Sequence, residues 1–310
     1  MATGGTAFIS HVECSKHDMG AYHPECPARL SAIEDSLIAA RIADLLVRYE
    51  APLAGVDHLL RVHPRPYIEA VEATAPAHGI VHLDPDTAMC ADTWAAALRA
   101  AGAGVLAADL VVSGRHPNAF CSVRPPGHHA TRTRSMGFCI FNNVAIAAMH
   151  ALEAHGLERV AIIDFDVHHG NGTEEIFSDD ARVLMVSTFQ HPFYPYSGTD
   201  NPAANMVNVP LAAGTGSDGF RAAVERIWMP ALEGFRPEMV FFSAGFDAHI
   251  EDDMAMLRLV DSDYSWVTAK VKNVVDHTGR GRVVSMLEGG YSLPALGRSV
   301  VQHLKVLAGL

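Results

Sequence analysis

The chain reads Val160-Ala161-Ile162-Ile163-Asp164-Phe165-Asp166-Val167-His168-His169 across an abrupt change of character. Four apolar residues come first, and carboxylates and imidazoles follow them directly. A continuous apolar run of this length is typical of a strand that is buried on both faces of a parallel sheet. We therefore predict a buried strand that ends where the acidic residues begin.

Similar β-rich runs recur along the chain, with helical patterns between them. The runs are 7–9, 119–123, 160–163, 183–187, 239–243 and 282–287, and the helical patterns are 27–49, 92–110, 143–154 and 218–232. Strand and helix in alternation predict right-handed crossovers and a mostly parallel sheet with helices on both faces, an α/β fold. No repeat and no Gly/Ser/Pro-rich linker divides the chain, so we predict one domain over residues 1–310.

The composition excludes several classes of protein. With 49% hydrophobic and 19% charged residues in 310, the chain can build a large core. The net charge of -12 argues against binding nucleic acid through phosphate contacts, although it is compatible with a cationic substrate. Five cysteines without a CxxC pair indicate reduced thiols, and neither a signal peptide nor a membrane span is evident, so we expect a cytoplasmic protein.

Polar clusters follow four of the apolar runs. They are 124–129 (Arg-Pro-Pro-Gly-His-His), 164–169 (Asp-Phe-Asp-Val-His-His), 244–247 (Ala-Gly-Phe-Asp) and 288–291 (Glu-Gly-Gly-Tyr). In an open parallel sheet the binding site lies beyond the carboxyl ends of the strands. These clusters therefore predict one rim that collects histidine, aspartate and tyrosine.

One cluster has the chemistry of a metal site. In extended geometry Asp164, Asp166 and His168 share one face, and two of them together with Asp247 would supply three ligands. A catalytic zinc site uses three protein ligands and keeps one position open, and oxygen-rich ligation would also accept iron(II) or cobalt(II). The alternative is a strand end with a solvated acidic turn.

Two other clusters suggest acid–base and oxyanion chemistry. His128 and His129 would form a tandem pair beside the metal, with Asp164 as the carboxylate partner of one of them. Tyr291, on a glycine turn, could donate a hydrogen bond to a developing oxyanion. The alternatives are one core and one exposed histidine, and a turn tyrosine that packs its ring.

Together these clusters resemble the zinc-dependent histone deacetylase family, which includes bacterial deacetylase-like amidohydrolases and acetylpolyamine amidohydrolases. Gly137-Phe138-Cys139 and Asn171 belong to the match, which runs from His23-Pro24-Glu25 to Tyr291. The resemblance implies the arginase–deacetylase fold, a single α/β domain around a parallel, usually eight-stranded sheet.

The resemblance also implies roles for individual residues. Asp166, His168 and Asp247 would be the zinc ligands, and Tyr291 would polarise the acyl carbonyl. His129 would be the general base and acid, His128 its electrostatic partner, and Asp164 the support of His128. Asn171 would stand beside His129, as it does in class II-like members of the family.

The family also has potassium sites and a substrate tunnel. The resemblance implies one potassium ion at Asp164, Asp166, His168, Ser187 and Thr188, and a second near Phe177, Asp180 and Val183. The tunnel would be built by Gly137, Phe138 and Tyr194, with Met254 at the gate position and Asp92 at the rim. Polyamine-selective members have an acidic residue at this gate position. Here the acidic residues Glu251, Asp252 and Asp253 come just before Met254, so the alignment does not decide whether one of them forms such a gate.

We expect a zinc-dependent amidohydrolase that removes acetyl or a related short acyl group from an amine. The partner would be a small acylated amine, such as an acetylpolyamine, or an acyl-lysine peptide, and the resemblance suggests a homodimer or homotetramer. The alternatives are an arginase-like dinuclear manganese ureohydrolase and a catalytically silent binding or regulatory module.

Overall fold

The computed structural model describes residues 4–278 and 280–310, and its centre is a parallel sheet of eight strands. The strand order is β2-β1-β5-β10-β9-β6-β7-β8, and every neighbouring pair is parallel. The bounds are β1 Ala7–Ser10, β2 Val47–Glu50, β5 Asn118–Cys121, β6 Val160–Asp164, β7 Val183–Gln190, β8 Met206–Leu211, β9 Met239–Ala244 and β10 Val283–Leu287. The predicted α/β class is confirmed.

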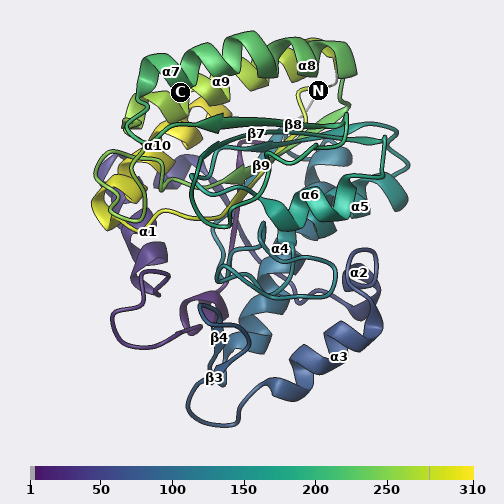
Figure 1. Ribbon diagram of the computed structural model, residues 1–310, viewed down its shortest axis with the longest axis vertical. Helices are drawn as coiled ribbons and strands as arrows, with labels where there is room; N and C mark the ends of the chain where they lie inside the picture. The colour runs from purple at the N-terminus through teal and green to yellow at the C-terminus, as the bar shows by residue number, and fades with distance from the viewer. Residues whose placement is uncertain (1–3, 279) are drawn as a thin grey trace.

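Helices cover both faces of this sheet, as Figure 1 shows with α7–α9 above it and α4–α6 below it. The helices are α1 Ala28–Ala39, α2 Val56–Leu59, α3 Arg65–Thr74, α4 Thr93–Val112, α5 Asn143–Glu153, α6 Asn171–Phe177, α7 Ser217–Ala223, α8 Met229–Phe235, α9 Asp261–Thr278 and α10 Leu293–Ala308. A two-stranded hairpin of β3 (Val81–His82) and β4 (Ala88–Met89) lies below, near α3 (Figure 1). Because the helices cover the two faces, the carboxyl ends of the strands are left to the connecting loops.

The central strands are buried on both faces, as their continuous apolar sequences predict. Every residue of β5, β6, β9 and β10 is buried, whereas all four residues of the edge strand β2 keep contact with solvent. Helix α4 is long and apolar enough to cross a membrane, but 67% of its most apolar window is buried inside the protein. Its packing against α5 and β5 accounts for that composition.

Two predicted helices differ in the structure, and two strands of the eight-stranded sheet were not predicted. The helix predicted over 27–49 ends at Ala39, because Arg41 takes a left-handed φ of 58° and the chain then forms β2. Strand β8 was not predicted; its residues alternate in burial and include Pro210, so it lacks a continuous apolar run. The helix predicted over 218–232 is interrupted by a π-helical turn at Val224–Trp228.

His303 is a buried histidine of α10 that is held neutral by its surroundings. The Thr268 hydroxyl donates to the Tyr264 carbonyl at 2.6 Å, so its oxygen accepts from Nδ1 of His303 at 2.6 Å. Nε2 then accepts from the Ser285 hydroxyl at 2.9 Å. Burial lowers the pKa of His303 from 6.5 to about 3.

We predict that His303 makes the fold acid-sensitive. Between pH 6.5 and about 3 the unfolded chain binds a proton that the folded chain does not, so stability falls as pH falls through this window. The slope from this group is at most about 1.4 kcal/mol per pH unit. Urea unfolding across this range should show a shallower pH dependence for His303→Gln, while the exposed His78→Gln keeps the native slope. Equal slopes for the native chain and His303→Gln would contradict the assignment.

Candidate active site

The polar clusters after β5, β6, β9 and β10 converge at the carboxyl edge of the sheet. Three of these clusters, through His129, His168 and Tyr291, border a cavity of about 190 Å³. Its lining residues are Asp86, His129, Gly137, Phe138, His168, Phe193, Tyr194, Met254 and Tyr291. The structure therefore brings one predicted imidazole of each histidine cluster and the predicted tyrosine to a single cavity.

Asp166, His168 and Asp247 place three potential metal ligands at the floor of this site. Nδ1 of His168 lies 3.0 Å from Oδ1 of Asp166 and 3.3 Å from Oδ2 of Asp247. Tetrahedral coordination with bonds of ~2.0–2.1 Å separates ligand atoms by roughly 3.3 Å. All three residues are buried, and Oδ2 of Asp247 accepts no hydrogen bond from the described residues. This donor set fits a divalent metal.

The electrostatics of the three residues also favour a cation. Burial and the charge of Asp166 raise the pKa of Asp247 to about 7. Burial disfavours a charged imidazole, yet Asp166 and Asp247 raise the pKa of His168 to about 10. Two buried carboxylates so close together are stable only with a positive charge between them.

His128 is held in its charged form. Its Nδ1 donates to Oδ2 of Asp164 at 2.9 Å, and its Nε2 lies 3.8 Å from Oδ2 of Asp166. Burial opposes the charge, but Asp166 and Asp164 raise the pKa of His128 to about 10. The expected partnership of Asp164 with one histidine of the pair is thus present in the geometry.

His129 is held neutral, although its ring centroid lies only 4.1 Å from that of His128. Burial and then the charges of His128 and His168 hold the pKa of His129 well below its usual range. Nδ1 of His129 lies 2.8 Å from Oδ1 of Asn171, whose amide nitrogen points at the Met136 sulfur at 3.4 Å. Nδ1 of His129 therefore donates to Asn171, and Nε2 keeps a free lone pair that can accept a proton.

Glu288, which was not predicted to have a role, positions the histidine turn. Its Oε2 accepts from the main-chain N–H of Gly127 at 2.6 Å and of His128 at 3.1 Å. The next residue, Gly289, donates to Oδ2 of Asp166 at 2.9 Å, and a Cβ there would lie 2.0 Å from Oδ2 of Asp247. A side chain at Gly289 would therefore displace Asp247, one of the three candidate metal ligands.

Tyr291 is fixed by groups on two distant segments. Oδ2 of Asp252 accepts from the main-chain N–H of Tyr291 at 2.6 Å, and the Arg29 guanidinium lies 5.0 Å from its ring centroid. Nε of Arg29 also donates to the Gly290 carbonyl at 2.7 Å. Burial and the charge of Asp247 raise the pKa of Tyr291 well above 10, so its hydroxyl stays a donor.

Aromatic rings form the walls of the cavity. Phe138, which follows Gly137, has a left-handed φ of 69° and lies edge-on to Tyr291. Tyr194 stands edge-on to both His129 and His168, and its hydroxyl oxygen is buried without a partner among the described residues. Burial and the charge of Asp86 raise the pKa of Tyr194, so it remains a neutral phenol.

Asp86 occupies the rim position that the sequence analysis assigned to Asp92. Its Oδ1 accepts from the main-chain N–H of Gly137 at 2.9 Å and so supports the strained turn before the Phe138 wall. Asp92 instead precedes α4, makes no capping hydrogen bond with its side chain, and does not line the cavity. The signal for Asp86 was the Asp84-Pro85-Asp86 turn between two short strands, which the sequence reading passed over.

Phe193 is another wall residue that the sequence analysis missed. Its ring stacks on that of His168 with centroids 5.7 Å apart. It stands directly before Tyr194, so the adjacent Phe-Tyr pair was the available signal.

The acidic residues before Met254 do not form a gate. Met254 itself lines the cavity, as predicted for the gate position. Asp252 is turned toward Tyr291 and Ser292, and Glu251 pairs with Arg298 at 2.7 Å. The gate position itself is therefore apolar, and among the residues that line the cavity the carboxylate is that of Asp86.

Comparison with known proteins decides the family. The histone deacetylase domain model matches residues 23–307. The chain belongs to the histone deacetylase family. It is 38% identical over 294 residues to a histone deacetylase-like amidohydrolase of Pseudomonas aeruginosa, covering 92% of this chain and 76% of the relative.

Two further matches agree with this placement in the histone deacetylase family. A probable deacetylase of Archaeoglobus fulgidus is 37% identical over 296 residues, 93% of this chain and 82% of the relative. The crystal structure of the HDA15 HD domain superposes with a TM-score of 0.92 at 33% identity and covers 99% of this chain and 89% of that one. The arginase–deacetylase fold, expected from the resemblance, is confirmed.

This deacetylase-family site does not have the layout of a dinuclear ureohydrolase. Asp166, His168 and Asp247 form one group of three potential ligands. The neighbouring His128 and Asp164 are hydrogen-bonded to each other and do not extend that group. Among the described residues, the other group of this kind lies on α4 and after α5, away from the rim. No second ligand set thus adjoins the first within the described chain.

The two expected potassium positions differ in how well the residues fit an ion. At the first, Ser187 pairs in register with Asp164, and its buried hydroxyl has no partner among the described residues, as an ion ligand would require. Asp166, His168 and Thr188 are buried within the same strand ends. These residues fit a potassium ion.

The second potassium position is already filled by a side chain. The amide nitrogen of Asn205 lies 2.8 Å from the carbonyl oxygen of Phe177, 3.1 Å from that of Asp180 and 3.0 Å from that of Val183. An ion and this amide cannot share the point where the three carbonyls converge. The expectation of a second ion near Phe177, Asp180 and Val183 is therefore corrected.

We predict that removing this amide creates a potassium requirement. Asn205→Ala leaves three carbonyls without their shared donor and should cost about 1–3 kcal/mol of stability. Thermal unfolding in KCl, compared with LiCl at equal ionic strength, should recover most of that loss in Asn205→Ala. The native chain should gain less from potassium than the variant. An equal potassium effect on both proteins would contradict the replacement of an ion by Asn205.

Proposed function

We propose that this chain is a zinc-dependent amidohydrolase that removes acetyl or another short acyl group from an amine. One observation carries the proposal. One aromatic-walled cavity adjoins three side chains that can ligate a metal, a neutral imidazole next to a charged one, and a neutral phenol. Hydrolysis of an unactivated amide needs an activated water, a base, an oxyanion donor and an acid, and this arrangement supplies a candidate for each.

Asp166, His168 and Asp247 are the residues that would hold the metal. Zinc bound there would supply Lewis-acid chemistry toward an acyl oxygen and lower the pKa of a water. The carboxylates and their hydrogen bonds to main-chain N–H groups, such as Val167 to Asp247 at 2.9 Å, fix the ligands before any ion arrives. The fit of the buried, unpartnered Oδ2 of Asp247 supports this assignment.

The two histidines would have different roles, His129 as base and then acid, and His128 as its charged partner. His129 is neutral with Nε2 free, so it can take the proton of the attacking water. His128 stays charged against Asp164, which keeps the pKa of His129 low and stabilises negative charge in the site. After attack, the proton held on Nε2 of His129 can pass to the departing amine. Neighbouring groups whose pKa values are driven apart are the usual sign of such a division.

Tyr291 would act on the acyl oxygen. Its neutral hydroxyl lines the cavity, and Asp252 and Arg29 hold its backbone and ring. A fixed donor of this kind strengthens its hydrogen bond as the carbonyl becomes an oxyanion, so it stabilises the transition state more than the substrate.

The shape of the cavity suits a linear side chain that ends in a small acyl group. Phe138, Phe193 and Tyr194 would enclose a methylene chain, and the acyl group would lie beyond them, beside His129, His168 and Tyr291. We infer that Met254 favours acyl-lysine over polyamine substrates, because no carboxylate at that position would attract a second ammonium group.

The state of the cysteines bears on the compartment of the enzyme. Cys14, Cys26, Cys90, Cys121 and Cys139 are all unpaired. Free thiols suit a reducing compartment, so we retain the cytoplasm as its location. The expected homodimer or homotetramer, and the expectation that neither nucleic acid nor membrane is a partner, remain part of the proposal.

We predict that Tyr291→Phe lowers kcat on an Nε-acetyl-lysine peptide by about 10²–10³-fold, the usual effect of losing one oxyanion donor. KM and zinc content should stay nearly unchanged, because the interaction is made mainly in the transition state. Steady-state kinetics and elemental analysis on the purified protein test this. Near-native kcat would remove the role of Tyr291, and loss of zinc would make the tyrosine structural.

We predict that the gate position sets the preference between acyl-lysine and polyamine. The native protein should have a higher kcat/KM on an Nε-acetyl-lysine peptide than on an acetylated polyamine. Met254→Glu should move this ratio toward the polyamine by about tenfold or more, and Met254→Gln, which adds no charge, should not. A native preference for the polyamine would show that Met254 is not the determinant.

A further inference from the structure

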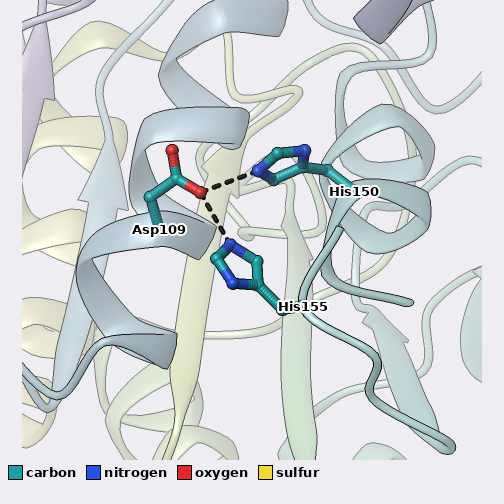
Figure 2. Close-up of side chains that lie close together, drawn as sticks. All are labelled: Asp109, His150 and His155. Atoms are coloured by element: carbon teal, nitrogen blue, oxygen red, sulfur yellow. Dashed lines mark hydrogen bonds and ion pairs between the residues drawn. The ribbon is translucent and has the colours of Figure 1, made fainter. Parts of the chain in front are cut away.

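A second cluster of potential metal ligands consists of Asp109, His150 and His155 (Figure 2), none of which lines the catalytic cavity. Asp109 comes from α4, His150 from α5, and His155 from the loop just after α5. Helix α4 leads into β5 and helix α5 leads into β6. The carboxyl-terminal ends of both helices therefore lie at the edge of the sheet where the strands begin. The catalytic cavity lies at the carboxyl edge, and the two clusters share no residue.

The three side chains point at one another, as Figure 2 shows. Oδ1 of Asp109 lies 2.7 Å from Nε2 of His150 and 2.7 Å from Nε2 of His155. The two imidazole rings are perpendicular, with centroids 5.2 Å apart. These are hydrogen-bond distances, shorter than the roughly 3.3 Å between ligand atoms around a tetrahedral zinc ion. Two imidazole nitrogens and one carboxylate oxygen thus converge, and an ion would replace their hydrogen bonds after a small rotation of the side chains.

Solvent reaches this cluster from one side. The side chain of Asp109 is 47% exposed and that of His155 26%, whereas His150 is 9% exposed and anchors the group in α5. An ion could enter without unfolding the helices, and water could complete its coordination. The neighbouring Arg61 does not oppose a cation strongly, because it pairs with Glu153 at 3.2 Å.

His58 packs edge-on against His150 but is not a further ligand. Its Nδ1 accepts from the main-chain N–H of Gly55 at 3.2 Å, so its proton is on Nε2. The site therefore offers three protein ligands and leaves the remaining positions to water, unlike a closed structural zinc site.

We propose that Asp109, His150 and His155 form a second divalent-metal site, selective for zinc, nickel or copper over magnesium and calcium. Imidazole nitrogen is a preferred ligand of the former metals, whereas the latter prefer oxygen alone. The bound ion would join the end of α4 to the loop between α5 and β6. It would act on stability and not on the chemistry of acyl transfer, since it lies at the opposite edge of the sheet.

The surroundings of His150 set the strength of this site. Metal binding at Nε2 leaves the ring proton on Nδ1, which is buried and has no partner among the described residues. Loss of such an outer hydrogen bond costs roughly 10–100-fold in metal affinity. We therefore expect micromolar and not nanomolar binding.

The test is calorimetric titration of ZnCl₂ into the zinc-loaded enzyme, so that the catalytic site is already filled. The native protein should bind one further zinc per chain with a Kd in the micromolar range, and Asp109→Asn and His155→Ala should each weaken it at least tenfold. His78→Ala, which removes an isolated exposed histidine, should leave it unchanged. His155 lies in a surface loop, so replacing it should leave the core of the protein intact. An unchanged kcat of His155→Ala on an acetyl-lysine peptide would verify that the fold is intact.

Soaking native crystals in ZnCl₂ and collecting at the zinc edge locates the ion independently. The expected result is an anomalous peak between Asp109, His150 and His155 that is missing in His155→Ala. Binding to the native protein no tighter than to His155→Ala, or a peak only elsewhere, overturns the proposal. Neither result depends on the catalytic assignment, because the first ion and the reaction are measured separately.

Discussion

The rest of the site depends on the burial of four carboxylates at the carboxyl edge of the sheet. Asp164, Asp166, Asp247 and Glu288 are each at most 1% exposed. An unpaired buried charge costs several kcal/mol, so each carboxylate requires a cation or several hydrogen-bond donors. Asp164 has the His128 imidazolium, Glu288 has two main-chain N–H groups, and Asp166 and Asp247 share His168.

This constraint explains why the two adjacent histidines differ. His128 is charged because two carboxylates face it, whereas burial, and then the neighbouring charge of His128, lower the pKa of His129 and keep it neutral. Asn171 orients His129 with a neutral acceptor and so adds no charge that would raise its pKa. An aspartate at that position would raise the pKa of His129, so that a larger fraction of the ring would already carry a proton at neutral pH.

A second buried network fixes the loop that carries Tyr291. Arg29 lies between Glu25 and the Gly290 carbonyl, and Arg124 binds the same Glu25 carboxylate. Both guanidinium groups are fully buried, so they can be accommodated only where Glu25 neutralises them. The position of the phenol thus depends on residues near the start of the chain.

Much of the sheet and the ligand set could be predicted because both are local in sequence. Continuous apolar runs marked the buried strands, and the polar residues directly after them became the rim, as for Asp166 and His168. The edge strand β2 was not predicted, because its sequence Val-Arg-Tyr-Glu includes two charged residues and is mostly exposed, so it has no continuous apolar run.

The rest could not be predicted because it depends on contacts between distant segments. Arg29 and Gly290 are 261 residues apart, and no local pattern marks their hydrogen bond. Asp86 was missed for Asp92 because only the folded hairpin turns Asp86 toward Gly137. The role of Asn205 follows from three carbonyls on another part of the chain, which sequence spacing does not display.

The central claim is that the buried carboxylates at the rim hold one catalytic metal ion. The direct measurement is the anomalous difference map of crystals of the active enzyme, recorded on both sides of the zinc edge. We expect a single peak at the rim, bounded by Asp166, His168 and Asp247. Fully active crystals with no peak there, or with two peaks separated by about 3.5–4 Å as in a dinuclear centre, would contradict it.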